Sequence, residues 1–358
     1  MSKINVAVIF GGVSNEHDIS LKSAVTIINA IPKDKYNVIP VGITKKGRWL
    51  YYPGEPEGIT GGIWETHPDS TPAVILPDPM YRGMLKFSGG EFSIVKIDAV
   101  YPAVHGKNCE DGVLQGLLEM SGIPFVGSGA LSSAVCMDKS LTHSVLERFG
   151  IKMARWKCIQ RSDIARLGEF AHECAEKFGF PVFIKPACSG SSVGISRAET
   201  EEEIISGLKT AFSHDSKAIA EEYIKGREIE CAVFGNDDTD TFASDPGEII
   251  AANTFYDFDA KYQNAESKTI IPEDIQKDGT AKSVRETAIK AYKACSCRGL
   301  SRVDFFLTEN GNLYLNEINT LPGFTSISMY PKLMAHMGIS ITELTDKLIQ
   351  SAIDFTHN

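Results

Sequence analysis

The first third of the chain alternates between stretches with apolar residues at every second position and stretches with apolar residues every three or four positions. Strand patterns cover Ile4 to Phe10, YNVIPVGIT and FSIVKIDAVYPAV, whereas IINAIP closes a helix pattern and GVLQGLLEM forms another. Strands that alternate with helices build a mainly parallel sheet, because each helix carries the chain back between strands. We predict an α/β domain over residues 1–122, with an irregular Gly-, Pro- and Thr-rich excursion over residues 52–92.

Residues 123–216 form a second region in which helix and strand patterns are mixed. The pattern predicts helices near residues 139–149 and 163–178, and strands around WKCIQ and PVFIKPA. A further helix starts after Thr200, with Glu203 placed as its capping-box partner. We predict an α+β domain here.

Residues 217–358 form a third region, which we also predict to be an α+β domain. Its strand patterns are AIAEEYI and REIECAVFG, and the loop NTFYDFDAKYQNAES follows them. A helix over residues 279–296, a hairpin and an amphipathic helix from Ile341 complete it. The chain shows no internal repeat, so three distinct domains account for its length.

Composition narrows the functional classes. A net charge of −10 without a basic run argues against nucleic acid or an anionic membrane as partner, so a phosphate ligand needs a local basic pocket. No stretch has the length of a signal peptide or a membrane span, and we expect a cytoplasmic protein. The eight cysteines are scattered, and the pair Cys295 and Cys297 lacks the partners that a zinc site requires, so we expect reduced thiols.

A glycine turn, IFGGVSNEHDIS, follows the first predicted strand over residues 9–20. Backbone N–H groups in a strand-to-helix turn bind anions, but the carboxylate of Glu16 would repel one. Neither the dinucleotide spacing nor the P-loop spacing of glycines is present. From these residues alone, the simpler hypothesis is that Ser14 caps the next helix and that acids occupy its first turn.

The hairpin RVDFFLTENGNLYLNEINTLPGFTS carries the sharpest chemical signal. The Asn-Gly pair at 310–311 predicts a type I′ turn, which places Asp304 opposite Glu317 and Arg302 opposite Asn319 on one face. Carboxylate and amide oxygens suit Mg²⁺, whose other ligands are water and phosphate oxygens. The alternative is a solvated hairpin face with incidental charges.

Three weaker signals suggest a phosphate and nucleotide site. In FIKPACSGSSVGIS, Lys185 ends a buried strand and a Gly- and Ser-rich loop follows, as in a flap over phosphates, although such a loop is also an ordinary turn. Lys139 starts a predicted helix and has the charge to bind a phosphate, although it could equally be a solvated surface residue. Glu221 and Glu222, followed by Tyr223-Ile224, have the groups to bind adenine and ribose, or they form a strand edge.

The signals follow a recognisable order along the chain: two lysines, the Gly- and Ser-rich flap, the acidic hinge at residues 221–222, and the hairpin face with Asp304, Glu317 and Asn319. This order resembles the ATP-grasp superfamily. The more specific resemblance is to the D-alanine:D-alanine ligases. The resemblance covers nearly the whole chain. It rests on Gly11-Gly12-x-Ser14-x-Glu16, His105-Gly106-x-x-x-Glu110-Asp111-Gly112, Met137-Asp138-Lys139, Lys185-Pro186 with Gly190-Ser191-Ser192-x-Gly194, Phe255-Tyr256-Asp257 leading to Lys261-Tyr262, and Asn316-Glu317-x-Asn319-Thr320-x-Pro322-Gly323.

The resemblance implies an ATP-grasp fold and the ligation of two D-alanines through an acyl phosphate, for peptidoglycan precursor synthesis. ATP and two Mg²⁺, or Mn²⁺, would be the cofactors, and the partners would be small molecules and a second copy in a homodimer. It assigns the D-alanines, the reacting centre and the second-substrate loop to Glu16, Ser191, Tyr262, His105, Arg302, Gly323, Ser328 and Met329. It assigns ATP to Lys139, Lys185, Ser192, Glu221, Glu222, Ile224, Glu228 and Lys261, and metal to Asp304, Glu317 and Asn319.

Two alternatives to this function remain. The neutral flap residues Cys188 and Ser189 stand where many relatives carry Arg and Glu, and the loop after Tyr262 partly resembles D-alanine:D-serine ligases. Met329 opposes that assignment, because resistance-type ligases resemble one another in having arginine there, and the Lys261-Tyr262 pair argues against D-lactate. A non-catalytic protein that binds a nucleotide or an amino acid is the second alternative, which a complete metal face with its arginine disfavours.

Overall fold

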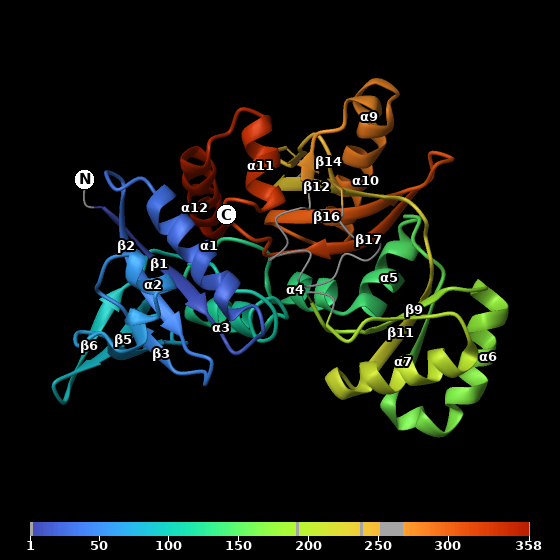
Figure 1. Ribbon diagram of the computed structural model, residues 1–358. Coiled ribbons are helices and arrows are strands. Elements are labelled where there is room, and N and C mark those ends of the chain that lie inside the picture. Colours follow the sequence, from blue (N-terminus) through green and yellow to red (C-terminus); the bar gives the residue numbers. More distant parts are fainter. Residues whose placement is uncertain (1–2, 191–192, 237–238, 251–267, 358) are drawn as a thin grey trace.

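The computed structural model describes residues 3–190, 193–236, 239–250 and 268–357. Three sheets organise the chain, one in each of three successive regions, and the helices pack on their faces (Figure 1). This confirms the predicted α/β class for the first region and the α+β class for the two that follow.

The first sheet has the strand order β6-β5-β4-β3-β2-β1-β7. Its strands are β1 (Ile4–Gly11), β2 (Tyr36–Ile43), β3 (Trp49–Tyr51), β4 (Thr71–Ile75), β5 (Gly83–Ser88), β6 (Glu91–Lys96) and β7 (Ala99–Pro102). Only β2-β1-β7 are parallel, and β3 to β6 extend the sheet in antiparallel order. The sheet is therefore mixed and not mainly parallel as predicted, and the predicted irregular excursion over residues 52–92 is wrong in part, since β4, β5 and the start of β6 extend the sheet.

The helices of this region are α1 (His17–Ala30), the short α2 (Glu57–Thr60), a 3₁₀ turn (Ile63–Glu65) and α3 (Val113–Ser121). Helix α1 does not begin as predicted. Its N-cap is Glu16, without a side-chain capping bond, while the Ser14 hydroxyl donates to the carbonyl of His105 at 2.7 Å. Ser14 therefore ties the glycine turn to a second loop instead of capping the helix.

The central sheet is antiparallel, with the order β10-β9-β11-β8. Its strands are β8 (Trp156–Gln160), β9 (Val182–Pro186), β10 (Ser196–Ala198) and β11 (Lys217–Glu222), and its helices are α4 (Ala130–Met137), α5 (Lys139–Arg148), α6 (Leu167–Phe178) and α7 (Glu201–His214), with a 3₁₀ turn over Arg161–Arg166. The predicted cap of α7 is confirmed, because Thr200 Oγ1 accepts from the N–H of Glu203 at 3.2 Å.

Strand pairing leads us to propose a shift of both predicted domain boundaries. Strand β11 was assigned to the third region, but it pairs with β8 and β9 in the central sheet, so we propose a boundary after Glu222 in place of residue 216. At the other end, Phe125 pairs with Val100 of β7, so residues just beyond 122 still belong to the first sheet. The hydrophobic pattern of the sequence predicts where strands lie, but it does not specify which neighbouring strands they pair with.

The third sheet has the order β15-β14-β12-β16-β17, with β13 beside β12. Its strands are β12 (Arg227–Gly235), β13 (Phe242–Ala243), β14 (Gly247–Ile250), β15 (Lys268–Ile270), β16 (Gly299–Leu307) and β17 (Leu313–Asn319), and its helices are α9 (Glu273–Lys277), α10 (Thr280–Ala294), α11 (Met329–His336) and α12 (Ile341–His357). The loop over residues 253–267 lies outside the described residues.

The first and third regions share one hydrophobic core. Buried side chains of β1, β2 and α1 continue into those of α11, α12 and the loop that contains Leu321 and Phe324. The central sheet has its own core, formed by one face of β9 and β11 with α6 and α7. The opposite face of that sheet, which carries Phe183, Lys185 and Glu221, is thereby left to face the rest of the molecule.

The hairpin of β16 and β17 has the predicted functional pairs but a different turn. Only Gly311, at φ +74°, is left-handed, and the N–H of Gly311 donates to the carbonyl of Thr308 at 2.9 Å. The turn is therefore a three-residue loop instead of the predicted type I′ pair. An irregularity between Asp304 and Phe305 then shifts the register, so that Asp304 still pairs with Glu317.

Candidate active site

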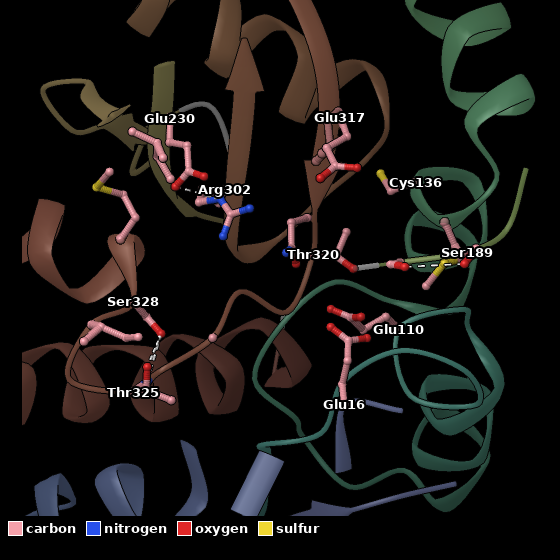
Figure 2. A pocket seen from close by; sticks show the side chains of 18 of the residues that line it. Glu16, Glu110, Cys136, Ser189, Glu230, Arg302, Glu317, Thr320, Thr325 and Ser328 are labelled. Atoms are coloured by element: carbon pink, nitrogen blue, oxygen red, sulfur yellow. Dashed lines mark hydrogen bonds and ion pairs between the residues drawn. The ribbon is translucent and has the colours of Figure 1, made fainter. Parts of the chain in front are cut away.

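Two cavities adjoin where the three regions meet. The larger is about 420 Å³ and lies between the central sheet and the third sheet, whereas the smaller is about 120 Å³ and borders the first region. Lys139, Glu230 and Glu317 line both, so the cavities are neighbours. Figure 2 shows the smaller one.

The glycine turn brings Glu16 to the wall of the smaller cavity. Gly11 and Gly12 have φ values of +86° and +109°, and a Cβ on Gly11 would lie 2.1 Å from the carbonyl oxygen of Ile43. Only glycine fits this turn, which lets the chain leave β1 sharply and start α1 directly behind Glu16. The carboxylate is consequently buried and faces the cavity.

Glu110 lies next to Glu16 in the same wall (Figure 2), and no role for it was predicted from the sequence. Its Oε2 accepts from the N–H of Gly106 at 2.6 Å. Burial, and then the nearby Glu16, raise the pKa of the Glu110 carboxyl well above its usual range. The Glu110 motif was visible in the sequence, but its contact with Glu16 depends on two loops far apart in the chain.

His105 is buried behind this wall and does not line the smaller cavity. Its Nδ1 lies 3.1 Å from the carbonyl oxygen of Leu321, and its Nε2 lies 3.2 Å from Ser23 Oγ. Burial lowers the pKa of His105, although Glu16 opposes this. The ring thus connects the first region to the loop after β17.

Arg302 projects into the smaller cavity from β16. Its Nε and Nη2 donate to the two carboxylate oxygens of Asp304 at 2.8 and 2.7 Å, and Nε also lies 3.1 Å from Glu230. Burial opposes its charge, but Asp304 and Glu230 outweigh this and raise the pKa of Arg302. The guanidinium is therefore held rigidly, as a group that stabilises developing negative charge must be.

The loop after β17 closes the smaller cavity with Gly323, Ser328 and Met329. Ser328 Oγ accepts from the N–H of Thr325 at 3.0 Å, and the two hydroxyls are 2.8 Å apart. A Cβ on Gly323 would lie 2.9 Å from that Oγ, so glycine allows the close turn. Met329 is buried and presents an apolar wall.

The larger cavity contains two of the three predicted phosphate-binding lysines, Lys139 and Lys185. Lys139 is the first residue of α5, behind the N-cap Asp138, and its Nζ donates to the carbonyl of Ser189 in the flap at 2.7 Å. Burial, with Lys185 nearby, lowers the pKa of Lys139, while Glu317 opposes the shift. Lys185 Nζ lies 2.6 Å from Glu221 Oε2, so the lysine is paired in this state.

The predicted acidic hinge also lines the larger cavity, through Glu221, Glu222, Ile224 and Glu228. Glu222 is engaged elsewhere, because its Oε1 and Oε2 accept from the backbone N–H and the Nε of Arg155 at 2.8 and 2.6 Å. Glu221 contacts Lys185, the proposed phosphate ligand, and is therefore the better placed of the two side chains for a ligand in the cavity.

The predicted metal face lies where the two cavities join. Asp304 lines the larger cavity, Asn319 the smaller and Glu317 both. Within the described part of the chain, no three His, Cys, Asp or Glu side chains gather as a complete metal site. Two carboxylates and an amide nevertheless fit a hard divalent cation that takes its remaining ligands from phosphate oxygens and water.

Four predicted site residues fall outside the described residues: Ser191, Ser192, Lys261 and Tyr262.

Comparison with known proteins places this chain in a family. Residues 5–128 match the family model described as the D-ala D-ala ligase N-terminus, and residues 145–350 match that of the D-ala D-ala ligase C-terminus. The chain belongs to the D-alanine-D-alanine ligase family. This confirms the resemblance inferred from the motifs and the ATP-grasp fold class.

Relatives in the ligase family match along almost the whole chain. The D-alanine-D-alanine ligase of Caldicellulosiruptor bescii is 46% identical over 99% of this chain and 96% of its own length. Among solved structures, the VanG D-Ala:D-Ser ligase from Enterococcus faecalis has a TM-score of 0.89 at 38% identity, covering 98% of this chain and 100% of that one. The D-alanine-D-alanine ligase from Coxiella burnetii has a TM-score of 0.86 at 35% identity, covering 99% and 96%. In the described part of this chain, no helix combines the length and apolarity of a membrane span.

Proposed function

We propose that the protein joins two D-alanine molecules with consumption of ATP. The observation that carries the proposal is the shared wall of the two cavities. A lysine-lined cavity large enough for a nucleotide meets a small carboxyl- and arginine-lined cavity at Glu317. This arrangement brings a terminal phosphate and an amino-acid carboxylate together, as carboxyl activation by phosphoryl transfer requires.

The first D-alanine would bind by its ammonium group at Glu16 and Glu110. Two buried carboxyl groups side by side favour a cation between them, and the fully ionised pair becomes stable once that cation binds. Ser191 and Tyr262 are proposed to complete the ammonium site. His105 contacts the carbonyl of Leu321 and would hold the loops on both sides of this subsite in place.

Lys139 and Lys185 would hold the phosphates of ATP, with Ser192 and Lys261 as further ligands. Glu221, Glu222, Ile224 and Glu228 would surround the adenosine. Asp304, Glu317 and Asn319 would hold divalent cations that neutralise charge on the phosphates, and we propose two Mg²⁺, with Mn²⁺ as a substitute.

The carboxylate of the first D-alanine would attack the terminal phosphorus of ATP, which forms the acyl phosphate and releases ADP. The neutral amine of the second D-alanine would then attack the acyl carbon, which forms the C–N bond, expels phosphate and releases the amine proton to solvent. Arg302 and the backbone N–H of Gly323 would stabilise the oxyanion formed during this attack. Lys139 already contacts the flap through Ser189, so ATP bound to Lys139 would bring the flap over the phosphates and exclude water.

Mixing the protein with ATP, Mg²⁺ and D-alanine tests the proposal. We expect phosphate release that depends on D-alanine and yields D-alanyl-D-alanine by mass spectrometry. ATP hydrolysis without peptide, or no hydrolysis, would contradict it. The second result is what a non-catalytic binding protein would give.

D-serine is the second candidate for the acceptor amino acid, because VanG shares the fold at a TM-score of 0.89. Met329 favours D-alanine, since its buried apolar side chain lines the subsite and offers no hydrogen bond to a serine hydroxyl. With D-alanine and D-serine at equal concentration, we expect D-alanyl-D-alanine as the main product. A majority of D-alanyl-D-serine would reassign the acceptor.

We further propose a cytoplasmic homodimer. All eight cysteines are free, as is usual in a reducing compartment. Phe87, Phe92 and Ile94 are exposed side by side on β5 and β6, an apolar surface suited to a second copy. Light scattering should give twice the mass of the chain, and Phe92→Ser should lower it.

A further inference from the structure

Helix α5 presents three polar side chains one turn apart, at Lys139, His143 and Glu147. Each contacts a different segment of the central region. Lys139 donates to Ser189 in the flap, His143 Nε2 lies 2.9 Å from Glu221 Oε1, and Glu147 accepts from Trp156 Nε1 at 2.9 Å. Because residues four apart share one helix face, this face of α5 is fixed to the nucleotide side of the central sheet.

Glu221 is held by two donors, one on each oxygen. Lys185 approaches Oε2 at 2.6 Å and His143 approaches Oε1 at 2.9 Å. Burial disfavours the charge, but Lys185 and His143 outweigh it and keep the pKa of the Glu221 carboxyl well below its usual range. The carboxylate thus has one orientation as long as both donors are present.

The buried environment of His143 directs its ring to one polar contact, the carboxylate of Glu221. The residue is 2% exposed and does not line the larger cavity. Among the described residues, its Nδ1 has no hydrogen-bond partner, so Nε2, which lies against the carboxylate of Glu221, is the ring nitrogen that donates. The Trp156 ring packs on the imidazole, with centroids 5.4 Å apart, and fixes its plane.

We propose that His143 is a positioning residue for nucleotide binding, which acts through Glu221 on Lys185. ATP must draw Lys185 toward its phosphates while Glu221 stays ionised and in place for the adenosine. His143 supplies the hydrogen bond that keeps Glu221 in position when the lysine turns to the nucleotide. This inference rests on the proposed function, since it takes ATP as the ligand of the larger cavity.

A purely structural histidine would behave differently. Loss of packing would destabilise the protein and weaken the binding of both substrates. Loss of a donor to Glu221 would weaken the binding of the nucleotide alone. His143→Leu keeps most of the volume and removes the donor. His143→Gln places an amide N–H near the position of Nε2, whereas the shorter amide of His143→Asn does not reach Glu221.

The test compares these three variants with the wild type and with His172→Leu, an exposed control on α6. The readouts are the KM of ATP, the KM of D-alanine, ADP affinity by calorimetry and thermal unfolding. We expect His143→Leu and His143→Asn to raise the KM of ATP and the Kd of ADP about tenfold, the effect of one lost bond to a charged group. The KM of D-alanine should stay unchanged, and His143→Gln should recover most of the ADP affinity.

Equal ADP affinity in all variants would overturn the inference. It would also be overturned if His143→Gln and His143→Asn lost ADP affinity equally and the KM of D-alanine rose in both. If His143→Leu does not fold, the Gln and Asn pair still decides. Failure of the proposed function is distinguishable, because it abolishes dipeptide synthesis in the wild type, whereas calorimetry with ADP needs no turnover.

Discussion

Lys185 and Glu221 form a buried ion pair across neighbouring strands of the central sheet, with Nζ 2.6 Å from Oε2. The lysine proposed for the phosphates and the acid proposed for the adenosine therefore neutralise each other in the absence of nucleotide. Binding exchanges this pair for a lysine-phosphate contact, which leaves His143 as the remaining donor to Glu221. The pair also connects nucleotide binding to stability, which makes it testable by two independent measurements.

Lys185→Ala should raise the KM of ATP and lower kcat, because a charge-assisted phosphate bond contributes roughly 1.5–3 kcal/mol. It should also lower the free energy of unfolding by about 3–5 kcal/mol at pH 7, since Glu221 keeps its charge with one donor fewer. The folded-state pKa of Glu221 is depressed, so this stabilisation is present above the ordinary carboxyl pKa and is lost as pH falls below it. Urea titrations should show the gap between wild type and variant closing below about pH 4.

The matched control for this prediction is Lys209→Ala, an exposed lysine on α7. Adding Glu221→Gln to Lys185→Ala should restore part of the stability, because it removes the uncompensated charge. An additive double mutant, or unchanged ATP kinetics in Lys185→Ala, would show that the two residues are not coupled.

Glu317→Gln should abolish turnover and leave folding intact. The change preserves volume but removes the charge of a carboxylate that lines both cavities and faces Asp304 across the hairpin. Phosphate release and thermal unfolding measure the two effects. Glu309→Gln, in the exposed turn of the same hairpin, is the control and should retain full activity. Near-normal phosphate release by Glu317→Gln would remove this residue from the metal site.

Glu110→Gln should make the protein less sensitive to alkaline pH. The pKa of Glu110 is raised in the folded state by burial and by Glu16, so the folded protein keeps a proton that the unfolded chain releases. The stability of the wild type therefore declines as pH rises above the ordinary carboxyl pKa, toward the raised value. Without D-alanine, the unfolding free energy of Glu110→Gln relative to wild type should increase from pH 5 to pH 8, and a constant difference would contradict the shift.

Glu16→Gln should weaken the first D-alanine subsite much more than the second. Glu16 faces the cavity at the proposed ammonium position, whereas Ser328 and Met329 line another part of it. Two-site kinetics of dipeptide synthesis separates the two KM values. Equal losses at both subsites would assign Glu16 to the structure of the glycine turn instead of to substrate.

Much of the site was predictable because its residues lie in motifs that end strands or begin helices. Glu16, Lys139 and Lys185 are of this kind, and each lines a cavity. What the pattern could not predict depends on contacts between distant segments. One such contact is between Glu110 and Glu16, which lie side by side in the cavity wall. Another is the hydrogen bond from Arg155 to Glu222. The pairing of β11 was also not predictable, because its apolar pattern fits a strand of either the central or the third sheet.

The hairpin shows how a correct prediction arose from two compensating errors. An Asn-Gly pair favours a two-residue turn, which would place Asp304 opposite Glu317 along a regular ladder. The loop is one residue longer, and Phe305 pairs with Leu315, not with the residue that a regular ladder would require. The irregularity after Asp304 absorbs the extra residue and restores the functional pair. Local propensity does not reveal such bulges, because packing of the sheet on both sides selects them.

This relationship predicts that the turn and the catalytic end of the hairpin are independent. Gly311→Ala should lower the free energy of unfolding by about 1 kcal/mol, since alanine resists the left-handed φ of +74°. The irregularity between Asp304 and Phe305 separates the turn from the metal face, so kcat and the KM of ATP should not change. Gly168→Ala on α6, where a Cβ meets open space and φ is not left-handed, should be neutral or slightly stabilising in the same urea titration. A fall in kcat for Gly311→Ala would show that the turn, and not the bulge, sets the register of Asp304 and Glu317.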